Sequence, residues 1–130
     1  MSGRFFLDTN AIVELLKGND NVLRIVRSAD FLACSIISEL EYSSFSGLTE
    51  NDVNLIDEFL SRISVIDICH SDTELKREIL GARKAKKIKL PDAIILASAK
   101  LKNCQLVTAD IELIKAARKI GAAVAGFPLP

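Results

Sequence analysis

Two kinds of hydrophobic pattern alternate along the chain. Short runs rich in β-branched or aromatic residues predict strands, and between them apolar residues recur at the three- and four-residue spacing of amphipathic helices. The predicted strands are 4–7, 31–34, 64–69, 105–107 and 122–125. The predicted helices are 11–17, 21–28, 35–45, one that follows Thr49, 71–85, 92–101 and 110–120. This alternation predicts an α/β fold, in which a mostly parallel sheet of four to five short strands carries helices on both faces.

Polar residues mark where several of these helices begin. Thr49 is expected to be an N-cap, and Ser71 with Glu74 three residues later matches a capping box. Asp110 is expected to cap the helix that follows the fourth strand. The helix 92–101 is apolar around most of its circumference, which predicts that it is buried.

Length and composition narrow the class of protein. The 130 residues fit one domain, 1–130, and 49% hydrophobic with 26% charged residues is typical of a soluble globular protein. No apolar run approaches the roughly 20 residues of a membrane span. The N-terminus does not resemble a secretion signal, so we expect a cytoplasmic protein without a membrane partner. Seventeen basic and seventeen acidic residues cancel, so a nucleic-acid partner would require a local basic patch or a bound cation.

The sulfur and imidazole groups offer little chemistry. Cys34, Cys69 and Cys104 are isolated in apolar segments, which favours buried reduced thiols. His70 is the only histidine, so a zinc site lacks ligands and a histidine general base is improbable. We interpret Cys69 and His70 as the end of the third strand.

Four acids occupy positions where a parallel sheet binds ligands, outside the carboxyl ends of its strands. Asp8 follows the first strand and Asp110 lies just beyond the fourth. Glu39 is one turn into the helix after the second strand, and Asp92 is in the first turn of the apolar helix. We therefore expect all four side chains to face one crevice.

Each acid also has an ordinary structural explanation. Asp8 and Asp110 are suitable N-caps, and an acid in a first turn, such as Asp92, is favoured by the helix dipole. Glu41 competes with Glu39, because two helical residues two positions apart point in different directions and only one can enter the crevice. We choose Glu39, which directly precedes an expected apolar contact at Leu40 and shares a helical side with Ser35.

Taken together, the acids favour a metal site. Two carboxylates 4 Å apart repel by about 4 kcal/mol at an effective dielectric near 20, and a bound cation relieves that repulsion. Oxygen ligands suit Mg²⁺ or Mn²⁺, which polarise a phosphodiester and activate a bound water. The chain offers no Ser-His-Asp arrangement, reactive Cys-His pair or glycine-rich phosphate loop as an alternative.

These motifs resemble those of the PIN-domain family, in order and over essentially the whole chain. The similar segments are 5–10 (FFLDTN), 35–40 (SIISEL), 89–99 (KLPDAIILASA) and 106–110 (LVTAD). The third is the most specific. Two departures from the family pattern are Ala109, where many relatives have Arg, and a glycine that is delayed to Gly47. The size of the chain is similar to that of the VapC-type toxins of toxin–antitoxin pairs.

The resemblance implies a Mg²⁺- or Mn²⁺-dependent endoribonuclease that hydrolyses RNA with a metal-activated water. It implies metal ligation and catalysis by Asp8, Glu39, Asp92 and Asp110, with Thr108 and Asn10 as supporting polar neighbours. It also implies a small antitoxin as partner and a homodimer. The apolar residues of 53–63 and the tail 127–130 favour the same homodimer.

The local sign of an RNA substrate is a basic run that leads to Asp92. Within it, Lys86, Lys87 and Lys89 are candidate phosphate contacts, although a solvated helix end explains them equally well. Two other functions remain open. A phosphatase with Asp8 as nucleophile would favour an acid two residues on, where the chain has Asn10. A non-catalytic PIN-like module that binds RNA or protein would have lost the acids, and all four are present.

Overall fold

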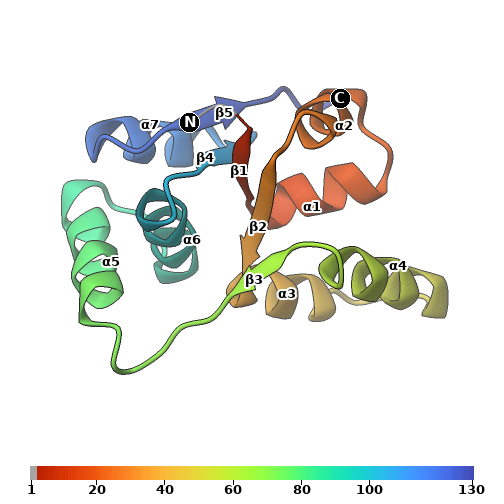
Figure 1. Cartoon of the computed structure of the whole chain (residues 1–130), viewed down its shortest axis with the longest axis horizontal. Coiled ribbons are helices and arrows are strands. Elements are labelled where there is room, and N and C mark those ends of the chain that lie inside the picture. Colours follow the sequence, from red (N-terminus) through yellow and green to blue (C-terminus); the bar gives the residue numbers. More distant parts are fainter. Residues whose placement is uncertain (1–2) are drawn as a thin grey trace.

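A parallel sheet forms the centre of the molecule (Figure 1). The computed structural model describes residues 3–130; residues 1 and 2 of the predicted domain lie outside the described part. Within that part the sheet has five strands in the order β3-β2-β1-β4-β5, and every neighbouring pair is parallel. The strands are β1 (Arg4–Leu7), β2 (Phe31–Ser35), β3 (Ser64–Ile66), β4 (Gln105–Thr108) and β5 (Val124–Gly126). The predicted fold class is confirmed.

Helices cover both faces of this sheet (Figure 1). They are α1 (Thr9–Leu16), α2 (Asp20–Arg27), α3 (Ile36–Ser43), α4 (Glu50–Leu60), α5 (Thr73–Ala85), α6 (Leu90–Leu101) and α7 (Ile111–Lys119). One hydrophobic core joins the sheet to α5, α6 and α7, and a second joins the opposite face to α1, α2, α3 and α4. The apolar helix is α6, and most of its residues are buried as its composition predicts.

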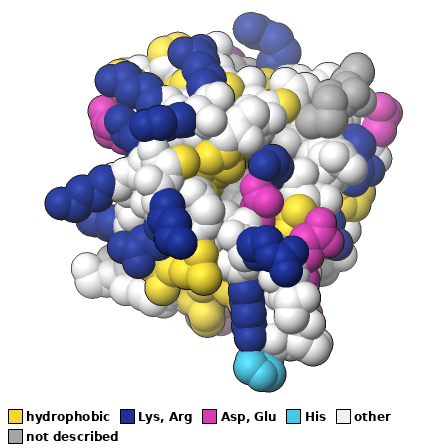
Figure 2. Space-filling view, turned by 90° about the vertical axis from the view of Figure 1, so that its left-hand side faces the viewer, with side chains coloured by type: hydrophobic (Ala, Val, Ile, Leu, Met, Phe, Trp, Pro, Cys, Tyr) yellow, Lys and Arg dark blue, Asp and Glu magenta, His cyan; other side chains and the backbone are white. Residues whose placement is uncertain are grey.

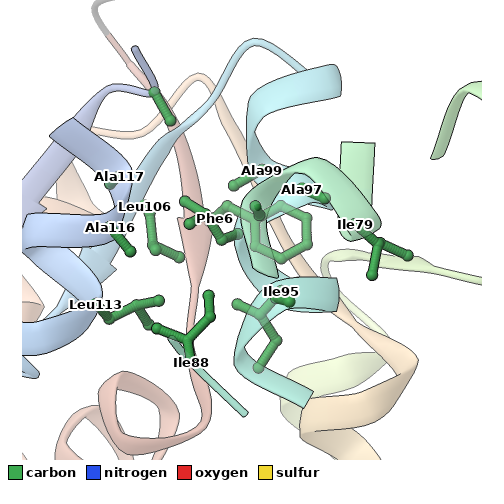
Figure 3. Close-up of a cluster of buried hydrophobic side chains, with 14 of the residues drawn as sticks. Phe6, Ile79, Ile88, Ile95, Ala97, Ala99, Leu106, Leu113, Ala116 and Ala117 are labelled. Atoms are coloured by element: carbon green, nitrogen blue, oxygen red, sulfur yellow. The ribbon is translucent and has the colours of Figure 1, made fainter. Parts of the chain in front are cut away.

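The central strand β1 supplies both cores because successive side chains of a strand point to opposite faces. Phe6 is fully buried in the core beneath α5, α6 and α7, where Ile95 and Leu106 surround it (Figure 3). Phe5 and Leu7 enter the other core. A strand buried on both faces is continuously hydrophobic, which explains why 4–7 lacks alternation.

Helix starts follow the polar residues with one exception. Thr49 caps α4 and forms a reciprocal capping box with Asp52, and Asp110 caps α7. The prediction for Ser71 is wrong, because Asp72 is the N-cap of α5 and its carboxylate accepts a hydrogen bond from the Leu75 N–H at 3.0 Å. Asp and Ser are about equally good N-caps, so the sequence alone did not distinguish Asp72 from Ser71.

The third strand is shorter than predicted. It ends at Ile66, which pairs with Ser35, the last residue of β2. Because α3 begins directly after Ser35, residues beyond Ile66 have no strand to pair with. Cys69 and His70 are therefore exposed rather than at a strand end, and the prediction that Cys69 is buried is wrong. Cys34 and Cys104 are buried as predicted. Between residues 3 and 130, no helix has the length and apolar character needed to cross a bilayer.

One buried polar group in α6 leads to a stability prediction. Ser98 is 2% exposed, and its hydroxyl has no hydrogen-bond partner among residues 3–130. A buried unsatisfied hydroxyl costs about 1–3 kcal/mol, so Ser98→Ala should raise the free energy of unfolding by about 1 kcal/mol. Urea denaturation would measure it. Ser35→Ala is the matched control and should be destabilising by about 1 kcal/mol, because Ser35 caps α3. Equal destabilisation by both variants would contradict the prediction.

Candidate active site

The candidate site lies where the order of the strands reverses. From β1 the chain continues to β2 and β3 on one side, whereas β4 and β5 lie on the other side of β1. Ligands of open α/β sheets bind at this switch point, beyond the carboxyl ends of the strands. A pocket of about 180 Å³ occurs there, lined by Asp8, Thr9, Asn10, Glu41, Phe45, Asp92, Ile95 and Asp110. A larger cavity, about 340 Å³, lies beside the edge strand β3 and away from these residues.

Asp8 is the deepest acid of the pocket, at 5% exposure. It follows β1 directly and caps α1, so its Oδ1 accepts a hydrogen bond from the Ala11 N–H at 2.7 Å. Burial raises the pKa of the Asp8 carboxyl to about 6, and the charges of Asp110 and Asp92 add to the rise. The Thr108 hydroxyl and the Ala11 N–H oppose that rise. The fold therefore confines a carboxylate where its charge is costly.

Asp92 faces Asp8 from the first turn of α6 and is half-buried. Its pKa is raised by burial, then by the charges of Asp110 and Glu41, and Lys89 acts in the opposite direction. Burial is the larger cause for both acids and the neighbouring carboxylates add to it, so negative charge is costly in this pocket.

Asp110 and Thr108 connect β4 to this cluster. Asp110 is the exposed N-cap of α7, and its Oδ1 accepts hydrogen bonds from the N–H groups of Glu112 and Leu113 at 2.9 and 3.2 Å. The Asp110 N–H in turn donates to the Thr108 hydroxyl at 3.0 Å. Thr108 is fully buried and also acts on Asp8, so it lies between two of the acids.

The fourth acid of the pocket is Glu41, and the prediction that Glu39 faces the crevice is wrong. The Thr9 hydroxyl donates a hydrogen bond to Glu41 Oε1 at 2.6 Å. Glu41 is three residues after Ser38, which is buried and whose Oγ is 3.1 Å from Thr9 Oγ1, so both side chains point to the site. Glu39 is instead close enough to Cys34 to add to the rise in the pKa of that thiol, which is mainly due to burial.

The error has a simple physical cause. The choice of Glu39 assumed that Leu40 makes an apolar contact, but Leu40 is 56% exposed. The signal that points to Glu41 is Ser38, which is buried beside Thr9 and lies about 60° from Glu41 but about 100° from Glu39 around the helix. Thr9, Phe45 and Ile95 also line the pocket, and none of them was predicted to be a site residue, although Thr9 and Ile95 lie within the matched segments 5–10 and 89–99.

The other predicted residues lie at varying distances from the pocket. Asn10 lines it and is exposed. The three lysines do not line it. Lys86 is paired with Glu112 at 3.1 Å, Lys87 is exposed, and Lys89 is near enough to lower the pKa of Asp92.

The lining residues fit a hard divalent cation. Four carboxylates face the pocket with no Lys or Arg among the lining residues, so positive charge is the missing component. Over residues 3–130, no three Asp, Glu, His or Cys side chains lie close enough to enclose an ion by themselves. Mg²⁺ commonly uses one or two carboxylates and retains several waters, so an open arrangement of oxygen donors suits it.

Known proteins resemble this chain in sequence pattern and in fold. The PIN domain family matches residues 5–119, and no curated protein matches the sequence. Among solved structures, the chain is similar to a toxin-antitoxin complex from Klebsiella pneumoniae, with 25% identity, a TM-score of 0.77, and coverage of 95% of this chain and 98% of that one. It is also similar to VapBC2 from Rickettsia felis bound to a promoter DNA fragment, with 24% identity, a TM-score of 0.75, and coverage of 95% of this chain and 98% of that one. A third similar structure is DNA-bound VapBC from Salmonella typhimurium, with 21% identity, a TM-score of 0.74, and coverage of 95% of this chain and 97% of that one.

The family match spans β1 to α7 and includes every acid of the pocket, from Asp8 to Asp110. The chain belongs to the PIN-domain family.

Proposed function

We propose that this protein is a Mg²⁺- or Mn²⁺-dependent endoribonuclease and the toxin of a VapBC-type toxin–antitoxin pair. The observation that carries the nuclease proposal is the pocket at the switch point, where Asp8, Glu41, Asp92 and Asp110 converge without a basic lining residue. Hydrolysis of a phosphodiester requires charge stabilisation and an activated water, and a cation bound among these carboxylates would supply both. RNA as substrate would place the protein in the cytoplasm.

The chain's own groups have distinct tasks in this proposal. Asp8 supplies the most buried negative charge of the pocket, and the hydroxyls of Thr108 and Thr9 hold Asp8 and Glu41 in orientation. Because the pKa of Asp8 is about 6, protons compete with the cation for this carboxylate in mildly acidic solution. Cleavage should therefore increase as the pH rises through this range.

The partner is proposed from the neighbours and from exposed apolar residues. The similar structures are described as toxin-antitoxin or VapBC complexes, which supports a small antitoxin as the partner of this chain. Val53 and Leu55 on α4 and Leu129 near the C-terminus are exposed and offer apolar surface to another protein. The homodimer expected from the same segments stays a prediction.

The nuclease proposal is tested with purified protein and a labelled RNA. Cleavage should require Mg²⁺ or Mn²⁺ and should stop in EDTA. Asp92→Asn should reduce turnover by at least about 100-fold while RNA binding persists, because the amide is a weaker ligand without charge. Asp67→Asn is the control, since Asp67 is an exposed acid beside the other cavity, and it should cleave at the wild-type rate.

Two results would oppose this proposal. Full cleavage by chelated, metal-free protein would remove the metal from the mechanism. A covalent aspartyl phosphate trapped at Asp8 would favour the phosphatase alternative.

A further inference from the structure

Charge is strongly segregated in this neutral chain. Residues 73–89 and 111–119, which are α5 with the loop after it and α7, carry ten of the seventeen Lys and Arg but only three of the seventeen Asp and Glu. The rest of the chain is correspondingly acidic. The ten basic residues are Lys76, Arg77, Arg83, Lys84, Lys86, Lys87, Lys89, Lys115, Arg118 and Lys119. We call the surface that they form the basic face.

The two segments form one continuous surface. α5 and α7 pack on the same side of the sheet and contact each other, and the ion pair of Lys86 with Glu112 joins their ends. Figure 2 looks onto this side of the molecule and shows Lys and Arg side chains spread over it with few acidic ones between them. All of the ten except Lys86 are exposed.

Ion pairing does not account for these charges. Among residues 3–130, only Lys86 and Lys115 of the ten form ion pairs, and both use the same carboxylate, Glu112. Both lysines lower the pKa of Glu112. Like charges gathered without partners repel and destabilise a fold by a few tenths of a kcal/mol per neighbouring pair. A polyanionic ligand would relieve that repulsion.

The basic face begins at the candidate active site and leads away from it. The loop 86–89 joins the end of α5 to the first turn of α6, which holds Asp92, and α7 starts at Asp110. From Lys86 back to Arg77, and from Asp110 to Lys119, each helical path extends about 13 Å at 1.5 Å per residue. In a stacked strand, which rises about 3.4 Å per nucleotide, this distance exceeds three nucleotide steps. An RNA held in the pocket would therefore have room to continue across the basic face.

We propose that the basic face is an RNA-backbone binding surface that holds nucleotides flanking the cleaved bond. This inference rests on the proposed function, which supplies the RNA in the pocket. Segments 73–89 and 111–119 contain no Phe, Tyr or Trp, so bases have no aromatic side chain to stack on and the contacts are made to phosphates. Binding here is independent of sequence and increases with the length of the RNA.

The test uses two RNAs that share their central sequence, one of about 6 and one of about 30 nucleotides, which differ in the number of phosphates available to the surface. The face variant combines Arg77→Ala, Lys84→Ala, Arg118→Ala and Lys119→Ala, and spares Lys86, Lys87 and Lys89. The control variant removes the same amount of charge elsewhere, with Lys17→Ala, Arg24→Ala, Arg27→Ala and Arg62→Ala. Fluorescence anisotropy in a salt series, with Asp92→Asn in all three proteins, gives Kd without cleavage.

The face variant should bind the long RNA at least about 10-fold more weakly near 0.1 M salt. Its slope of log K against log salt should flatten by about 0.7 for each phosphate that is no longer neutralised. The short RNA should bind both variants within about twofold of the parent, and the control variant should keep the parent's affinity for the long RNA. Unchanged binding of the long RNA by the face variant would overturn the inference and would favour an acidic protein as the ligand. Equally weakened binding by both variants would also overturn it, since net charge alone would then explain binding.

This outcome is separable from failure of the proposed function. If the wild-type protein cleaves no RNA but its long-RNA affinity depends on the basic face, the nuclease proposal fails and the binding surface stands. If cleavage depends on metal and Asp92 but the face variant binds and cleaves long RNA normally, the binding surface fails and the nuclease stands.

Discussion

Glu41→Gln is expected to reduce turnover by at least about 100-fold, whereas Glu39→Gln should change it by less than about threefold. A 100-fold loss corresponds to about 2.7 kcal/mol of transition-state stabilisation. The reason is position, because Glu41 lines the pocket with Asp8, Asp92 and Asp110, and Glu39 does not. Gln has nearly the same shape as Glu and can still accept the hydrogen bond from Thr9. The variant therefore removes one negative charge and leaves the local structure in place.

The measurement is kcat on one labelled RNA over a range of Mg²⁺ concentrations. Glu41→Gln should also need more Mg²⁺ for half-maximal rate, which a purely structural role of Glu41 would not produce. Matching thermal unfolding of the two variants would show that both are folded. A decrease in kcat with Glu39→Gln as large as that with Glu41→Gln would refute the assignment made from the pocket.

Much of the fold was predictable because its signals are local. β1 ends where the hydrophobic run does, at Leu7, and Asp110 caps α7 because it is the single polar residue between strand and helix. The positions of Asp8 and Asp92 follow from the same signals, since one residue ends a strand and the other lies in the first turn of a helix. In a parallel sheet these ends are brought to one edge by topology alone.

The choice between Glu39 and Glu41 required information that is not local. The direction of a helical side chain changes by about 100° per residue, so the answer depends on how α3 is rotated against the sheet. That rotation buries Ser38 and Tyr42 and turns the side of the helix with Glu41, rather than the side with Glu39, towards Thr9. Leu40, the residue on which the choice depended, is an exposed leucine of the kind that protein surfaces commonly contain.

The length of β3 and the basic face could not be predicted from the sequence, because both depend on contacts between segments that are far apart in the chain. A strand extends only as far as a neighbouring strand is available for hydrogen bonding, and β2, the neighbour of β3, ends at Ser35. The basic face combines α5 with α7, which are separated in sequence by α6 and β4. A net charge of zero over the whole chain conceals an asymmetry that appears once the two helices are seen together.

Asp8→Asn is expected to abolish turnover and, in metal-free protein, to raise the free energy of unfolding at pH 7. Burial raises the pKa of Asp8 from 3.8 to about 6, so the folded state holds its proton more tightly than the unfolded state. A shift of this size corresponds to about 3 kcal/mol at about 1.4 kcal/mol per unit. Its stabilising contribution is complete below about pH 4 and is lost as the pH rises through about 6. Asn does not titrate, and its side-chain oxygen can still cap α1 by accepting the Ala11 N–H.

Urea unfolding from pH 4 to pH 8 in EDTA would measure this difference. The wild-type free energy of unfolding should fall by up to about 3 kcal/mol relative to Asp8→Asn across that range. Added Mg²⁺ should reverse the order at pH 7, since ion at about 1,000 times its Kd stabilises the wild-type protein by about 4.1 kcal/mol and the variant by much less. Loss of turnover together with a gain in metal-free stability is the expected signature of a carboxylate kept for chemistry rather than for folding. If Asp8→Asn were instead less stable than wild type at pH 7 in EDTA, the charge of Asp8 would be supporting the fold, and excess negative charge would no longer explain why this pocket suits a cation.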